Sequence, residues 1–146
     1  MNNDFIIVIQ DTMKKGIIIL ILLIITLLDW AQFNLHSEKT VTVACDQSEE
    51  NVVHTALKLF ARDCQAVFSA QIESDVRVGD IIVGTLGKSP LLAKNGSDIS
   101  VLEGKKQAFL LMVLPNKKLL IVGSDSHGTA YGIMELSRLI GVQHCW

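Results

Sequence analysis

Two short polar turns, each following an apolar run, contain most of the residues that could do chemistry. Gly84 to Ser89 reads GTLGKS, and Gly123 to Gly128 reads GSDSHG. The first invites comparison with a phosphate-binding loop, which needs G-x-x-x-x-G-K-[ST]; here Ile82 occupies the position of the first glycine. Pro90 also biases Ser89 away from helical geometry. Nucleotide binding is therefore not predicted.

The second turn places serine, aspartate and histidine within six residues, but their spacing does not suit a hydrolase. A nucleophile elbow needs G-x-S-x-G. With Ser126 as its serine, the first glycine would have to be residue 124, which is serine here. Ser124, Asp125 and Ser126 are better interpreted as turn and helix-capping residues. Asp125 and Glu135 are ten residues apart, about 15 Å along a helix, which is too far for the usual pair of glycosidase carboxylates.

Other chemistry has little support in the sequence. The four histidines show no metal-ligand spacing, so no metal site and no cofactor are predicted. A net charge of −2, without a cluster of basic residues and aromatics, gives no case for nucleic acid. Three cysteines, Cys45, Cys64 and Cys145, leave at least one thiol unpaired. Cys45 and Cys64 are interpreted as small buried hydrophobic residues, although a bridge between them stays open if their Cα atoms approach within about 7 Å.

The elements that position the two turns can be read from apolar periodicity. Strands are predicted at 40–45, 81–85, 107–114 and 119–124, and 115–118 forms a hairpin turn between the last two. A long helix carries Val53 to Phe68 and starts with a capping box of Asp46 and Glu49. Residues 75–80 form a turn, and 91–95 one helical turn. Ile99, Val101 and Leu102 fix the polar loop 96–106 to the core.

A closing helix follows the second turn and ends at Gly141. Gly128 and Gly132 stand where a larger residue would hold this helix away from the sheet. The resulting order, β-α-β-β-β-α, predicts an α+β two-layer domain. Its four-stranded mixed sheet has the first two strands parallel, the hairpin antiparallel, and both long helices on one face.

The N-terminus resembles an export signal. Lys14 and Lys15 precede the apolar run Gly16 to Leu28, and Ala31 provides a small residue for cleavage. We expect residues 1–31 to be a leader with its true start at Met13, and 32–146 to be one exported accessory domain, periplasmic or extracellular. An uncleaved membrane anchor is the alternative, although the run is shorter than the roughly 20 residues of a span.

The two glycine-rich blocks carry a family resemblance. Residues 81–92, IIVGTLGKSPLL, and 123–142, GSDSHGTAYGIMELSRLIGV, resemble the N-terminal domain of glycoside hydrolase family 115, whose pattern runs close to IGTLGKSPLI and AGSDKRGTIYGIYDLSEQIGV. The similarity spans about residues 40–142. That family comprises xylan α-1,2-glucuronidases, so the resemblance implies an accessory, non-catalytic part of an exported enzyme that acts on glucuronoxylan.

The family pattern continues with an aromatic run into a large catalytic barrel, whereas this sequence has Gln143 to Trp146. The resemblance therefore implies a fragment truncated before the barrel, or a small relative. Its partner would be the missing barrel, and xylan-derived oligosaccharide a further ligand. Whether the chain is itself an enzyme stays open, and no catalytic residue is assigned. A free-standing secreted carbohydrate-binding or protein-interaction module is the alternative.

The expected positions of the two glycine-rich turns in the sheet give one further hypothesis for a functional site. If strands 81–85 and 119–124 are parallel, both turns lie at one edge of the sheet. Lys88, Ser124, Asp125 and His127 are then candidates for contact with substrate or with a neighbouring domain. Gly84, Gly87, Gly123, Gly128 and Gly132 are the structural glycines. A helix apolar round most of its circumference predicts that some of Tyr131, Leu136, Leu139 and Trp146 are exposed.

Overall fold

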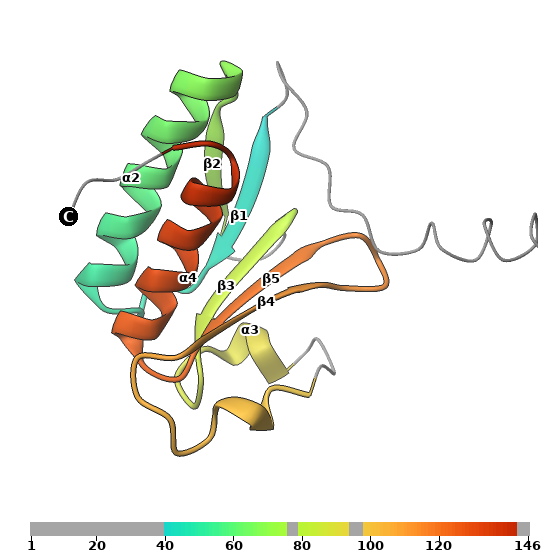
Figure 1. Ribbon diagram of the computed structural model, residues 1–146. Coiled ribbons are helices and arrows are strands. Elements are labelled where there is room, and N and C mark those ends of the chain that lie inside the picture. The colour runs from blue at the N-terminus through green and yellow to red at the C-terminus, as the bar shows by residue number, and fades with distance from the viewer. Residues whose placement is uncertain (1–39, 76–78, 94–97, 143–146) are drawn as a thin grey trace, which may run out of the picture. The chain divides into compact units, whose positions relative to one another are not determined.

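A computed structural model describes residues 40–75, 79–93 and 98–142 (Figure 1). The predictions for residues 1–31, Cys145 and Trp146 lie outside these ranges. The strands are β1 (Val41–Cys45), β2 (Ile72–Asp75), β3 (Ile81–Thr85), β4 (Phe109–Val113) and β5 (Leu119–Gly123). The helices are α2 (Asn51–Phe68), α3 (Pro90–Ala93) and α4 (Ser126–Leu139), with a 3₁₀ turn, η1, at Ser100–Leu102.

The five strands form one mixed sheet in the order β2-β1-β3-β5-β4. β1 is parallel to both β2 and β3, β3 is parallel to β5, and β4 is antiparallel to β5. The predicted α+β class, the parallel pairing of β1 with β3 and the antiparallel hairpin are confirmed. The predicted count of four strands was wrong, because β2 also joins the sheet, beside β1.

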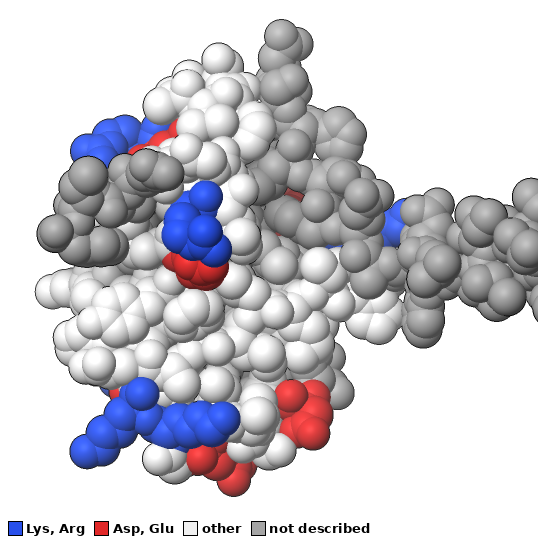
Figure 2. All heavy atoms as spheres, viewed as in Figure 1, with Lys and Arg blue, Asp and Glu red and all other residues white. Residues whose placement is uncertain are grey.

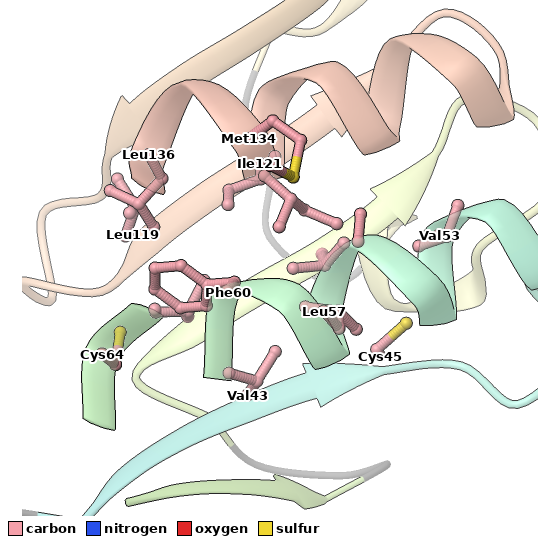
Figure 3. Packing of buried hydrophobic residues seen from close by; sticks show 14 of the residues in the cluster. Val43, Cys45, Val53, Leu57, Phe60, Cys64, Leu119, Ile121, Met134 and Leu136 are labelled. Carbon is pink, nitrogen blue, oxygen red and sulfur yellow. The ribbon is translucent and has the colours of Figure 1, made fainter. Parts of the chain in front are cut away.

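Both long helices cover the same face of the sheet, as predicted (Figure 1). Figure 3 shows Phe60 of α2 and Met134 of α4 packed with Ile121 of β5 between the helices and the sheet. A second cluster lies on the opposite side, where Leu92 of α3 and Leu102 of η1 contact side chains of β3 and β5. Of the three residues expected to fix the loop, Leu102 is buried and Ile99 half-buried, whereas Val101 is exposed.

The start of α2 differs from the predicted capping box. Its N-cap is Glu50, which makes no side-chain capping bond. Asp46 instead accepts hydrogen bonds from the amide and hydroxyl of Ser48, at 2.9 and 2.6 Å. The carboxylate of Glu49 accepts hydrogen bonds from Thr85 at the end of β3. Asp46 and Glu49 have the residue types of a capping box, but Glu49 makes hydrogen bonds to Thr85 in the sheet instead of capping the helix.

Helix α4 begins as expected and lies very close to the sheet. Asp125 is its N-cap and accepts a hydrogen bond from the Gly128 amide at 2.8 Å. A Cβ atom on Gly128 would lie 2.2 Å from the Ala108 carbonyl oxygen, and one on Gly132 would lie 2.8 Å from a methyl group of Ile121. The predicted role of these two glycines in close helix–sheet packing is confirmed.

The two described cysteines are free and buried, in agreement with their interpretation as small core residues. Burial raises the pKa of Cys45 to about 12 and that of Cys64 to about 11. Both thiols therefore stay protonated at neutral pH, and the open possibility of a Cys45–Cys64 bridge is not realised.

The prediction that some of Tyr131, Leu136, Leu139 and Trp146 are exposed is confirmed on α4. The exposed fraction is 43% for Tyr131 and 60% for Leu139. Leu136 is buried against the core, and the prediction that some of the four residues are exposed is borne out by the other two. Within the described ranges, no helix has the length and apolar character needed to cross a membrane.

Candidate functional site

The candidate site lies at the carboxyl edge of the parallel strands. β3 and β5 run side by side in the same direction, with Thr85 opposite Gly123 in the register. The turns that follow them therefore meet at one edge, as the sequence hypothesis required. Helices α2 and α4 both begin there, so their positive N-terminal ends face the same region as its carboxylates.

A buried polar network joins three elements at this edge. Glu49, only 5% exposed, accepts hydrogen bonds from the Thr85 amide at 2.8 Å and the Thr85 hydroxyl at 2.7 Å. The hydroxyls of Thr85 and Thr129 lie 2.8 Å apart. Thr129 also approaches the carbonyl oxygens of Gly84 and Asp125, at 3.3 and 3.1 Å. The network links the segment before α2, the end of β3 and the first turn of α4.

Sequence reasoning missed all three side chains of this network. Thr85 and Thr129 each follow a glycine of the two turns, and Glu49 was predicted to belong to a helix cap. The available signal was the isolated threonine at the end of an otherwise apolar strand, since a buried hydroxyl needs a partner.

A second, more exposed cluster lies beside it. The ammonium group of Lys88 donates to the carboxylate of Glu50 and also lies 3.3 Å from the hydroxyl of Ser126. Hydrogen bonding from Lys88, and then from Ser126, lowers the pKa of Glu50. The same bond to Glu50 raises the pKa of Lys88. Lys88 is therefore held by an acidic partner, and its contact with substrate or a domain stays a prediction.

The remaining candidates are structural in their contacts. Asp125 accepts from the Gln107 amide at 2.7 Å as well as from Gly128, and these two bonds lower its pKa in that order. The Ser124 hydroxyl accepts a hydrogen bond from the Ala108 amide at 3.0 Å. His127 is exposed at the start of α4. The edge thus brings Lys88, Asp125 and His127 to one region, with Asp125 and Ser124 fixing the segment before β4.

Three of the structural glycines, Gly84, Gly87 and Gly123, lie in or next to the turns at this edge. A Cβ on Gly123 would lie 2.0 Å from the Thr129 amide, and one on Gly84 would lie 2.7 Å from the Cβ of Ser89. Gly87 has φ +75° and an open surrounding, so its role is conformational. These contacts explain why both turns are rich in glycine.

A shallow pocket of about 470 Å³ lies beside the first turn, lined by Gly87 to Pro90, Leu92, Ala93 and Ile99. Lys88 and Ser89 are the polar side chains of its lining, and among the described residues no carboxylate lines it. Glu135 lies on α4 and accepts hydrogen bonds from the Arg138 guanidinium at 2.7 and 2.6 Å. No group of three metal-binding side chains occurs within the described ranges.

Three carboxylates at this edge have structural partners. Inverting or retaining hydrolysis of a glycoside needs two carboxyl groups flanking one sugar bond. Here Glu49, Glu50 and Asp125 are each engaged by a threonine, a lysine or backbone amides. The groups that this edge could present to a ligand or a neighbouring domain are hydrogen-bonding side chains and the positive charge of Lys88.

Comparison with known proteins identifies one related solved structure. No family model and no curated protein matches the sequence. Among solved structures, the chain is similar to a family GH115 4-O-methyl-alpha-glucuronidase with specificity for decorated arabinogalactans. The two are 54% identical, with a TM-score of 0.75, and the match covers 77% of this chain. It covers only 15% of the neighbour's chain.

Proposed function

Because this chain is a relative of the GH115 glycoside hydrolases, we propose that it serves as an accessory N-terminal domain of an exported α-glucuronidase-like enzyme. In this role the domain has no catalytic centre of its own and supports a separate barrel that performs the hydrolysis. The observation that carries the proposal is the 54% identity to a GH115 structure of which this chain spans 15%.

The engaged carboxylates at the carboxyl edge support the non-catalytic role. Glu49 holds Thr85, Glu50 holds Lys88 and Asp125 holds two amides, so each has a structural task. A general acid in a glycosidase needs a raised pKa, whereas the pKa values of Glu50 and Asp125 are lowered. The substrate of the assembled enzyme would be a glucuronic-acid-decorated polysaccharide. The family resemblance favours glucuronoxylan, while the solved relative is specific for decorated arabinogalactans.

Incubation of the purified full chain with glucuronoxylan, and separately with decorated arabinogalactan, tests the proposal. We expect no release of glucuronic acid or its 4-O-methyl derivative by chromatography. A complete GH115 enzyme under the same conditions provides the positive control. Release by this chain above the background of a heat-denatured sample would overturn the non-catalytic role.

Two further measurements separate the alternatives. Calorimetric titration with xylo-oligosaccharides should show no heat for a supporting domain, whereas a carbohydrate-binding module would give a saturable signal. Export is tested by expression of the complete sequence in a bacterium and by mass spectrometry of periplasm and medium. We expect a product that begins near Gln32; a chain retained whole in the membrane fraction would favour the anchor.

A further inference from the structure

The two edges of the sheet differ in chemistry. β2, at one edge, contains Glu73 and Asp75 among its four residues. β4, at the other, reads FLLMV, and its five side chains are all at least partly exposed. Natural sheets usually protect an edge with charges, proline or a bulge, because unpaired backbone groups there recruit other strands. β4 has none of these within its span.

The outer side of β4 presents a regular set of backbone groups. At one end the Ser124 amide donates to the Ala108 carbonyl, and at the other the Leu114 amide donates to the Lys118 carbonyl, both at 2.8 Å. Bonded pairs alternate in an antiparallel ladder. The amides and carbonyls of Phe109, Leu111 and Val113 therefore point away from β5. Within the described part of the chain, no strand pairs with that side.

Both ends of this edge are fixed in place. The Asp125 carboxylate holds the Gln107 amide just before β4. After β4, the Lys117 amide donates to the Leu114 carbonyl at 2.8 Å and closes the hairpin turn. An edge that is already ordered loses little conformational entropy when a partner strand binds.

Apolar side chains flank the outer backbone. Phe109 is 38% exposed and lies against Gly132 of α4. Leu139 follows Gly132 by seven residues, so helical periodicity places it on the same side of α4, and it is 60% exposed. On the described surface visible in Figure 2, charged residues are few, and uncharged residues, polar and apolar alike, make up most of it. A strand added to β4 would find apolar contacts beside its hydrogen bonds.

Charge at the two ends of β4 selects the kind of partner. Lys105 and Lys106 precede the strand, and Lys117 and Lys118 follow it. In an antiparallel dimer through β4, the lysines that precede the strand in one copy would come near those that follow it in the other, and like charges brought together across a sheet are destabilising. A strand with acidic flanks would instead meet four positive charges.

We propose that β4 takes up an extended segment of a separate polypeptide, with an apolar centre and acidic flanks, as an added sheet strand. Recognition of this type derives affinity from main-chain hydrogen bonds and specificity from side chains at alternate positions. The interaction does not depend on the proposed function, since it uses only the exposed edge.

A labelled synthetic peptide tests this proposal directly. Its centre alternates valine and threonine, and two aspartates stand at each end. Fluorescence anisotropy with the purified full chain, in mild non-ionic detergent, should show saturable binding. A peptide with lysine flanks should bind at least roughly tenfold more weakly, because the flanking charges then repel. Methylation of alternate peptide nitrogens, which removes donors for the outer edge, should abolish binding.

Variants of the chain locate the binding surface. Lys106→Glu should weaken binding of the acidic peptide and improve that of the lysine-flanked one, whereas Lys58→Glu, an exposed charge reversal on α2, should change neither. Val113→Pro should block binding, since its amide faces outward, and a thermal unfolding curve checks that it folds. Lys106→Glu keeps the test valid if Val113→Pro does not fold.

Three results would overturn the proposal. They are equal effects of Lys106→Glu and Lys58→Glu, undiminished binding of the methylated peptide, or no binding by the unaltered chain. A concentration-dependent dimer in light scattering that Val113→Pro abolishes would show that a second copy occupies the edge instead.

Discussion

Thr85 is the residue through which a buried carboxylate is joined to α4. Its amide and hydroxyl both donate to Glu49, and its hydroxyl oxygen lies 2.8 Å from that of Thr129. A buried carboxylate that loses a hydrogen-bond partner still bears the free-energy cost of its desolvation. Breaking one bond of this network should therefore cost more stability than a typical hydrogen bond contributes. The same network holds the two glycine-rich turns at one edge.

Removal of the Thr85 hydroxyl tests this account. Thr85→Val keeps the shape and deletes the donor, and we expect the free energy of unfolding to fall by about 1–3 kcal/mol. Thr55→Val is the matched control, because Thr55 is exposed on α2 and its hydroxyl only contacts the Asn51 carbonyl. Urea denaturation of both variants provides the comparison. Equal losses would mean that the buried network contributes nothing particular to stability.

Asp125 predicts a pH dependence. Hydrogen bonds from the Gln107 and Gly128 amides hold its folded pKa below the ordinary value of 3.8. The charged form therefore stabilises the fold, fully above the unfolded pKa, and this contribution disappears as pH falls through the folded pKa. We expect the free energy of unfolding to decrease below about pH 4.

Asp125→Asn supplies the variant for that measurement, since asparagine also caps helices. Its free energy of unfolding should fall less steeply below pH 4 than that of the unaltered chain. The other carboxyls with lowered pKa values, Asp46, Glu50, Asp98 and Glu135, contribute the remaining slope. Identical slopes from urea denaturation at several pH values would contradict the assignment to Asp125.

At the scale of elements, the approach of α4 to the sheet depends on two glycines with different neighbours. Gly128 faces a backbone carbonyl oxygen, whereas Gly132 faces the methyl end of Ile121. A side-chain methyl group can rotate away, but the Ala108 carbonyl belongs to the segment held by Ser124. The two positions should therefore respond differently to the same added methyl group.

Alanine substitution at both positions makes this comparison. Gly128→Ala should lower the free energy of unfolding by about 1–3 kcal/mol through overpacking, even though alanine favours the helix. Gly132→Ala should change it by less than about 1 kcal/mol, because the gain in helix propensity offsets a movable contact. Chemical denaturation measures both. A stabilised Gly128→Ala variant would show that α4 can move away from the sheet freely.

The sequence revealed elements with strong apolar patterns and missed those defined by tertiary pairing. β1, β3, β5 and α4 carry runs or stripes that only a buried face explains. β2 reads IESD, too polar to stand out, and it becomes a strand because β1 offers an open edge. Glu49 was assigned to the wrong role because a glutamate can either complete a capping box or accept hydrogen bonds in a buried network, as it does here from Thr85. Spacing along the chain cannot show that Thr85 lies within reach.

At the scale of the whole molecule, the shared sheet with the GH115 relative predicts interchangeability. The match has a TM-score of 0.75 over 77% of this chain, so the backbone of the aligned part is closely similar. At 54% identity most buried positions can be filled by residues of similar volume, which cores tolerate well. If the domain only supports a barrel, as proposed, it should work when transplanted.

A chimera tests that expectation. The part of this chain that aligns with the solved GH115 enzyme would replace its counterpart there, and hydrolysis of decorated arabinogalactan would be measured. We expect a folded enzyme that keeps its substrate and loses less than roughly tenfold in kcat/KM, about 1.4 kcal/mol in transition-state stabilisation. The same chimera with Gly128→Ala should unfold at a lower temperature, because α4 is then displaced. A chimera that unfolds cooperatively at the temperature of the parent yet lacks activity would mean that the replaced stretch contributes directly to catalysis, and the supporting role would have to be abandoned.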